Sequence, residues 1–191
     1  MKMFLQAQQA MAGSIRTSTI SISAPFSTGS LERFSWFGQS AVHPRTLHGE
    51  KTFDEAQLRY RSFCSNQGFA NTRVNGCVHD EQIPVNKDGI YTIVVSRAAD
   101  RPRNARLECG VAWLPMADDG DGAVDEDATI FQLRHMLGTA NFPQAVQNIG
   151  ARGNEEAAMG EYFPKGRYVT TSAFEIALPC LKRKAIWDFS N

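Results

Sequence analysis

Alternation of apolar and polar residues gives this chain its clearest order, and it is strongest between residues 57 and 137. Residues 57–65 and 129–137 alternate with a period of two, which predicts half-buried β-strands. The run Ile90–Ser96 follows the turn residues Asn86–Gly89 and favours β-structure until its final serine, which predicts a strand in a central position. Shorter strands are predicted over residues 72–79, 111–116 and 168–178.

The same alternation assigns side chains to faces. In residues 57–65, Tyr60 and Cys64 share one face with Leu58, whereas Arg59 and Arg61 lie on the other. One face of the strand over residues 129–137 collects four side chains, Phe131, Leu133, His135 and Leu137. Asn75-Gly76 interrupts the strand over residues 72–79, where either a tight hairpin turn or a β-bulge fits.

Proline and glycine recur through residues 1–50, which predicts an irregular N-terminal arm. A β-sandwich domain is expected over residues 51–180 and a basic tail over residues 181–191. Short helices are predicted over residues 141–149 and from Asn154 to Met159. Many short strands joined by long loops predict an all-β fold with some short helices, built as an antiparallel β-sandwich or jelly roll.

Charge and hydropathy argue against two classes of partner. The 191 residues carry 20 basic and 20 acidic side chains, so the formal net charge is zero. Nucleic acids and anionic membranes need a basic surface, and neither is expected as a partner. No apolar run is long enough to cross a bilayer, which predicts a soluble chain without a transmembrane segment. Gln6, Gln8 and Gln9 interrupt any signal-peptide core at the N-terminus.

None of the four cysteines, Cys64, Cys77, Cys109 and Cys180, belongs to a CxxC pair, which argues against zinc ribbons and thioredoxin-like motifs. The favoured bridge joins Cys64 to Cys77 on neighbouring predicted strands. It would contribute about 3 kcal/mol in the chain-entropy model and would require an oxidising compartment. Four free thiols in a cytosolic protein are the alternative. Cys109 and Cys180 are expected to be unpaired or at most weakly paired.

A series of short phrases follows in order along residues 58–168: RYRSFCSN, TRVNGCVHDEQIP, DGIYTIVVS, RPRNA, VAWLP, LRHML, QAVQNI and MGEYFPKGRY. In this order they resemble secreted bacterial proteins related to Domain of Unknown Function 1214. The resemblance implies a β-sandwich or jelly-roll domain, often exported, and supplies no catalytic residues. It therefore favours a periplasmic or extracellular location, while the unclear export signal leaves a cytoplasmic one open. The residues that match the pattern are Cys64, Cys77, Asp80, Glu81, Gln82, Trp113, Pro115, Arg134 and Asn148.

Three functional groups, His79, Asp80 and Glu81, gather at one predicted strand end. Together with His135 they suggest a site of two histidines and one carboxylate, a ligand set that suits several divalent metals. No HxH pair of the cupin kind occurs, and a solvated strand end is the favoured alternative. We therefore predict no metal or other cofactor.

Two more residues complete the set of candidate ligand-binding positions. Trp113, beside Pro115, could line an apolar cleft, although core packing is the commoner role for such a pair. Arg134 lies on the polar face of its strand and is expected to pair with Asp80 or Glu81.

No motif in the sequence specifies a reaction, because GxSxG, Walker and GxGxxG phrases do not occur. The acidic loop over residues 118–127 fails the EF-hand template for calcium. We therefore expect a non-enzymatic binding or accessory β-sandwich module, exported if the resemblance holds, with a small-molecule or lipid-like ligand. The alternative is a hydrolase or metal-dependent enzyme centred on His79, Glu81 and His135.

Overall fold

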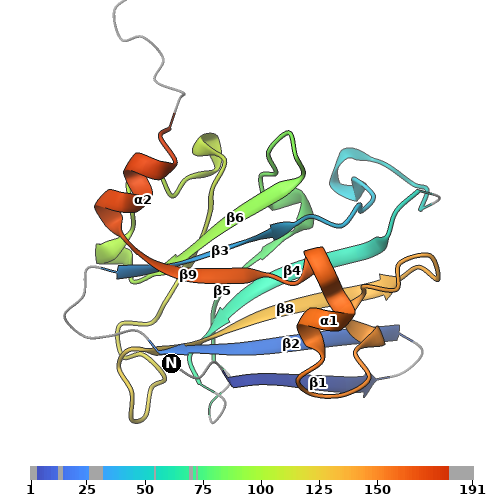
Figure 1. Ribbon diagram of the computed structural model, residues 1–191, viewed down its shortest axis with the longest axis horizontal. Coiled ribbons are helices and arrows are strands. Elements are labelled where there is room, and N and C mark those ends of the chain that lie inside the picture. The colour runs from blue at the N-terminus through green and yellow to red at the C-terminus, as the bar shows by residue number, and fades with distance from the viewer. Residues whose placement is uncertain are drawn as a thin grey trace, which may run out of the picture.

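Two β-sheets form the framework of the fold (Figure 1). The computed structural model describes residues 4–12, 15–25, 32–53, 55–68, 71 and 73–180, with side chains from Ser35 onward. The first sheet is antiparallel and follows the order β1 (Phe4–Ala12), β2 (Ile15–Pro25), β8 (Ala128–Gly138), β4 (Leu58–Asn66) and β5 (Val74–His79). The second follows the order β7 (Ala112–Pro115), β6 (Ile90–Ser96), β3 (Glu32–Gln39) and β9 (Lys165–Thr170).

The predicted all-β fold is confirmed, with β6 inside its sheet as its unbroken apolar run indicates. One strand pair departs from the antiparallel prediction, because β7 runs parallel to β6. Parallel neighbours need a crossover connection, and the long segment Arg97–Val111 between these strands supplies it. Its two short 3-10 turns are η3 (Ala98–Asp100) and η4 (Leu107–Cys109).

The expectation of an irregular arm over residues 1–50 is wrong, because β1, β2 and β3 all lie there. β3 is even an inner strand, paired with β6 on one side and with β9 on the other. The register places Ile20 and Ile22 of β2 opposite Leu133 and Phe131 of β8. These strands are rich in serine, threonine and glutamine, so their place depends on pairing partners distant in sequence rather than on local propensity.

Aromatic side chains fill the space between the two sheets. Trp36 of β3 stacks on Phe131 of β8 with ring centroids 4.6 Å apart, so the contact crosses from one sheet to the other. Phe63 of β4 lies 5.0 Å from the ring of Tyr91 on β6 and completes the cluster. All four side chains are almost fully buried, and each contributes on the order of 2 kcal/mol by leaving water. This core makes the two sheets a sandwich.

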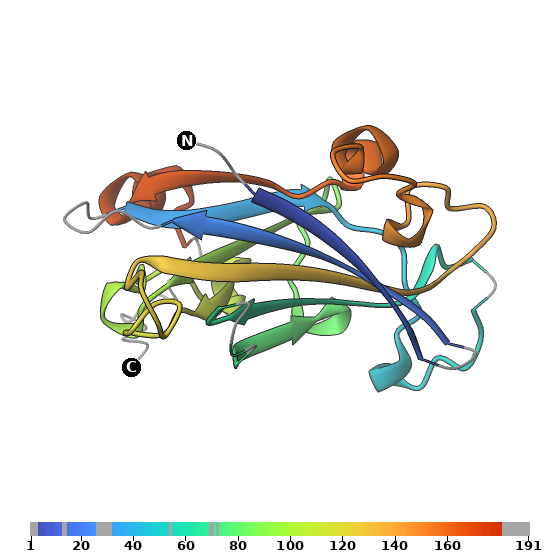
Figure 2. The ribbon, with the colours of Figure 1, turned by 90° about the horizontal axis from the view of Figure 1, so that it is seen from below.

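Two short helices lie at opposite ends of the sandwich (Figure 2). α1 (Glu155–Met159) forms where a helix after Asn154 was predicted. α2 (Thr171–Ala177) replaces the second half of the strand predicted over residues 168–178. It begins because the Thr170 hydroxyl accepts a hydrogen bond from the backbone N–H of Ala173, 3.1 Å away. The helix predicted over residues 141–149 is reduced to the 3-10 turn η5 (Val146–Asn148).

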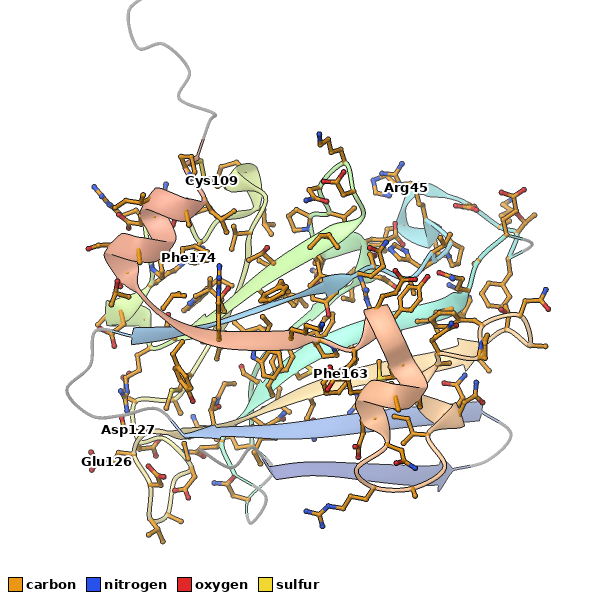
Figure 3. The ribbon with its side chains drawn as sticks, viewed as in Figure 1. Arg45, Cys109, Glu126, Asp127, Phe163 and Phe174 are labelled. Atoms are coloured by element: carbon orange, nitrogen blue, oxygen red, sulfur yellow. A yellow bond between two sulfur atoms is a disulfide. The ribbon has the colours of Figure 1, made fainter. Side chains whose placement is uncertain are left out.

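α2 covers the outer face of the second sheet. Its Phe174 is buried with Val94, Ala105 and Val111, in a cluster separate from the core between the sheets (Figure 3). Arg103 reinforces the contact with an ion pair to Glu175 of α2, with 2.6 Å between the guanidinium and the carboxylate. Val94 is therefore buried although it lies on the side of β6 that faces away from the first sheet.

Two disulfides are present, one predicted and one not. Cys64 of β4 is bonded to Cys77, its register partner on β5, as predicted. Cys109 of η4 is bonded to Cys180, just beyond α2, so the prediction that these two are unpaired is wrong (Figure 3). A strand over residues 168–178 gave no reason to bring Cys180 near Cys109, whereas the turn into α2 does.

Candidate functional site

The predicted cluster at the end of β5 forms, but Asp80 serves the fold within it. Asp80 begins the 3-10 turn η2 (Asp80–Gln82) and is buried. Its carboxylate accepts hydrogen bonds from the backbone N–H groups of Arg61 and Glu81, both at 2.9 Å. His43 and His79 lie 4.0 and 3.4 Å from its oxygens. The carboxylate therefore ties η2 to β4.

Glu81 holds a neighbouring turn, η1 (Thr46–His48). Its carboxylate accepts from the Thr46 hydroxyl at 3.1 Å and from the Leu47 N–H at 2.9 Å, and it lies 2.9 Å from Nδ1 of His48. Desolvation alone would raise the pKa of Glu81, but these hydrogen bonds together outweigh it and lower the pKa to about 2. All of its contacts therefore fasten one loop to another.

His135 lies in the interior, away from the other predicted ligands. It faces inward on β8, where Nδ1 accepts a hydrogen bond from the Val146 N–H at 3.2 Å. Burial, with a smaller effect from the positive charge of Arg61, lowers the pKa of His135 to about 3. The imidazole is therefore neutral near pH 7.

The predicted metal-ligand set is not brought together. His79 is in register with Ser62, and Ser62 in turn with Arg134, so these three share one face of the sheet. His135 follows Arg134 in sequence and therefore points to the opposite face. Among the residues that the structure describes, no group of three histidines, cysteines or acidic residues could hold a metal ion.

Sequence reasoning missed the burial of Arg61, the register partner of His135. Arg61 is 2% exposed, its guanidinium lies 5.0 Å from the ring centroid of Tyr91, and it donates to the Ser40 hydroxyl at 3.1 Å. Desolvation lowers its pKa and raises that of Tyr91, but a guanidinium stays charged. The sequence signal for this burial was Phe63, which lies two residues further along β4 and therefore on the same face as Arg61. Phe63 is fully buried, and Arg61 is buried beside it.

Trp113 and Arg134, the remaining candidates, lie apart from the η2 turn. Trp113 is half-buried on β7, with Arg101 stacked 4.3 Å from its ring centroid and its Nε1–H donating to the Ser96 hydroxyl. Packing, the commoner role for such a residue, accounts for these contacts. Arg134 is half-buried on the same face as His79, and its pairing with Asp80 or Glu81 stays a prediction.

An open cleft of about 450 Å³ lies elsewhere, where β5 and β7 meet at the rim of the sandwich. One wall comes from the start of β5 and the other from the loop after β7, with Pro115 between them. The size falls in the range of small-molecule sites. The lining residues are Arg73, Val74, Asn75, Ala98, Pro115, Met116, Ala117, Asp118 and Asp119.

A β-bulge shapes the first wall. The pairing of β4 with β5 runs from Ser65–Gly76 directly to Asn66–Val74, which leaves Asn75 as the extra residue. Bulges re-aim side chains, and the Nδ2 donor of Asn75 is buried without a hydrogen-bond partner. Of the two readings of Asn75-Gly76, the bulge is therefore the correct one.

Close packing fixes the floor of the cleft. A Cβ added at Gly76 would lie 2.8 Å from Cδ of Pro115, so only glycine lets β7 come this near to β5. The Ser65 hydroxyl donates to the Pro115 carbonyl at 2.6 Å and holds it from the β4 side.

Gln67 links the two walls from below. It is buried, its N–H donates to the Arg73 carbonyl at 2.8 Å, and its Nε2 donates to the Asp119 carboxylate at 2.6 Å. Asn71 completes the link, because its Nδ2 donates to Oε1 of Gln67 and its Oδ1 accepts from the Arg73 N–H. The cleft is thus built on a hydrogen-bonded frame and does not depend on loose surface loops.

Two carboxylates of the acidic loop over residues 118–127, those of Asp121 and Asp127, have partners within the protein. Oδ1 of Asp121 accepts from the backbone N–H groups of Ala123, Val124 and Asp125 at 2.8 to 3.0 Å. These bonds lower the pKa of Asp121. Asp127, the buried end of the loop, forms an ion pair with Arg97 at 3.1 Å.

Comparison with known proteins assigns no family. No family model matches the chain, and no curated protein matches it. Among solved structures, it is similar to an uncharacterised protein from Burkholderia cenocepacia, with 15% sequence identity and a TM-score of 0.37. The match covers 76% of this chain and 34% of the other, so the chain spans about a third of that protein's length. The resemblance to Domain of Unknown Function 1214 stays a prediction.

Proposed function

We propose that this chain is a non-enzymatic, small-molecule-binding module of an oxidising compartment, and that its site is the cleft between β5 and β7. The observation that carries the proposal is a preformed cleft of about 450 Å³, with the bulge at Asn75 in one wall and hydrogen bonds through Gln67 that join its two walls. A few polar groups within a partly apolar cavity are typical of ligand sites.

The composition of the lining supports binding rather than catalysis. The cleft is lined by no histidine, cysteine or serine, the side chains that most often serve as nucleophile or general base. The predicted alternative, an enzyme centred on His79, Glu81 and His135, has no observation in its favour, because the two histidines occupy opposite faces of the sheet.

The two disulfides support the compartment. Cys64–Cys77 and Cys109–Cys180 account for all four cysteines, and such bonds persist in secreted and periplasmic proteins rather than in a reducing cytosol. The resemblance to exported proteins agrees with this. In the described part of the chain, no helix is long and apolar enough to cross a membrane.

A fragment screen followed by NMR tests the proposal. A library of small polar and amphipathic compounds is titrated into labelled protein, and we expect amide shifts at Val74, Asn75 and Ala117. Asn75→Leu should weaken binding by about tenfold, because it changes the shape and polarity of the bulged wall of the cleft. Asn148→Leu, an exposed asparagine outside the cleft, is the matched control. Hits confined to the Arg61 interior or to the η1–η2 turns would contradict the site, and the absence of any hit would contradict the function.

A further inference from the structure

Residues of opposite charge line the two walls of the cleft. Arg73 contributes a guanidinium from the β5 wall, and Asp118 and Asp119 contribute carboxylates from the loop after β7. All three residues are exposed.

These charges do not neutralise one another. Within the described residues, no ion pair joins Arg73 to either aspartate, and the guanidinium of Arg73 has no side-chain partner. Asp119 accepts from Gln67 through Oδ1, whereas Asp118 has no hydrogen-bond or ion-pair partner among the residues that the structure describes. Gln67 bonds the backbone carbonyl of Arg73 and the side chain of Asp119, and so joins the two walls.

The middle of the cleft is apolar. Val74 is 56% exposed at the start of β5, and Pro115 and Ala117 continue the apolar lining between the charged walls. The lining therefore carries a cation on one wall, a short apolar stretch, and anions on the other wall.

We propose that the ligand is a zwitterion with a free ammonium and a free carboxylate, an amino acid or a short peptide with unblocked ends. This inference rests on the proposed function of the cleft. The ligand carboxylate binds Arg73, whose planar guanidinium suits bidentate contact. The ammonium binds Asp118, and small apolar side chains lie against Val74 and Pro115.

Four forms of one dipeptide test the inference by NMR titration: alanyl-alanine, its N-acetyl form, its C-terminal amide, and the form blocked at both ends. We expect the unblocked form to bind best. Blocking either end should weaken binding about tenfold, since each block removes one charge-assisted contact.

Variants assign each end of the ligand to one wall. Arg73→Gln should weaken alanyl-alanine about tenfold and leave binding of the amide unchanged, because the amide has no carboxylate to lose. Asp118→Asn should weaken alanyl-alanine similarly and leave the N-acetyl form unchanged. Arg152→Gln and Asp88→Asn remove one exposed charge of each kind outside the cleft and serve as matched controls.

The outcomes separate the two proposals. Equal binding of all four forms at the cleft, or fragment hits there without dipeptide binding, would overturn the zwitterion inference and leave the binding function standing. If Arg73→Gln and Arg152→Gln weaken the binding of alanyl-alanine equally, the zwitterion inference is also overturned. Binding would then depend on the overall charge of the protein and not on Arg73. If neither fragments nor dipeptides shift cleft residues, both proposals fail.

Discussion

The interior around Arg61 and the cleft at Arg73 use the same side chain in opposite ways. Arg61 lies between the sheets against aromatic rings, donates to Ser40 and is closed off from solvent. Arg73 lies at the rim and is exposed, and no side chain in the described part of the chain pairs with it. A buried charge must be compensated by the fold itself, whereas an exposed charge held at the edge of a cleft is available to a ligand. A charged side chain in the sequence can therefore serve the fold and not a ligand.

The contrast between sealed and rim positions is sharpest for two valines. Val94→Asp places an unpaired charge beneath α2, where the side chain is fully buried, and should cost more than about 4 kcal/mol, enough to unfold the domain. Val74→Asp at the exposed rim should change stability by less than about 0.5 kcal/mol. Circular dichroism and urea unfolding measure both. A native spectrum for Val94→Asp would show that α2 does not seal this face.

The sequence predicted best those elements whose side chains carry the signal themselves. β6 and the inward face of β8 follow from unbroken or alternating apolar residues that need no knowledge of their partners. β3 lies in the middle of its sheet but could not be found this way, because Gly38 and polar residues interrupt its apolar positions.

The cleft could not be predicted, for a related reason. It joins Asn75 to Pro115, and only the packing of two sheet edges brings them together. The sequence did raise the bulge at Asn75-Gly76 as an alternative, and the histidine–acid cluster after it drew attention to the wrong end of β5. Burial of Arg61 depends equally on the second sheet, which places Tyr91 against it.

Loss of the second disulfide should lower the free energy of unfolding almost as much as Val94→Asp does. Cys109–Cys180 spans 71 residues, and in the chain-entropy model its loss costs about 4 kcal/mol, compared with about 3 kcal/mol for Cys64–Cys77, which spans 13. The paired variants Cys109→Ser/Cys180→Ser and Cys64→Ser/Cys77→Ser test this by thermal unfolding. Non-reducing peptide mapping should give these two linkages, and a Cys64–Cys109 peptide would contradict the fold.

Substitutions of the two arginines address the contrast directly. Arg61→Ala should cost about 3 kcal/mol, because it leaves a void beside Phe63 and Tyr91. Arg61→Met fills the same space without a buried charge and should be within about 1 kcal/mol of the original stability, or higher. Arg73→Met should change stability by less than about 0.5 kcal/mol. If Arg61→Ala unfolds at the same urea concentration as the unaltered chain, the guanidinium is not part of the packing.

His135 gives the interior a pH signature. Its pKa is about 3 in the folded chain and near 6.5 when unfolded, so between these values only the unfolded chain takes up a proton. Stability is therefore full above pH 6.5 and falls with acid by about 1.4 kcal/mol per pH unit, or about 2.7 kcal/mol by pH 4.5. His135→Gln should remove this slope while keeping an acceptor for Val146. Urea unfolding at pH 7.0, 5.5 and 4.5 measures it, and an unchanged slope in the variant would assign the effect to another group.

Glu81 should give a smaller effect in a different pH range, because its contacts lie at the surface turn η1. Its pKa is about 2 in the folded chain, below the ordinary glutamate value near 4.3, so here the folded chain holds fewer protons than the unfolded one. The stability it contributes is complete above about pH 4.3 and is lost as the pH falls toward 2.

Glu81→Gln keeps an acceptor for Thr46 and Leu47 but removes the charge. The free energy of unfolding should therefore depend less on pH below 4.3, while the slope caused by His135 between pH 6.5 and 4.5 should stay the same. Glu50→Gln, an exposed carboxylate that accepts from the Arg45 N–H in the same loop, is the matched control and should leave both ranges unchanged. A Glu81→Gln curve whose slope differs from the original above pH 5 would show that the turn and the interior are coupled, and would remove the distinction between sealed and surface groups at this end of the molecule.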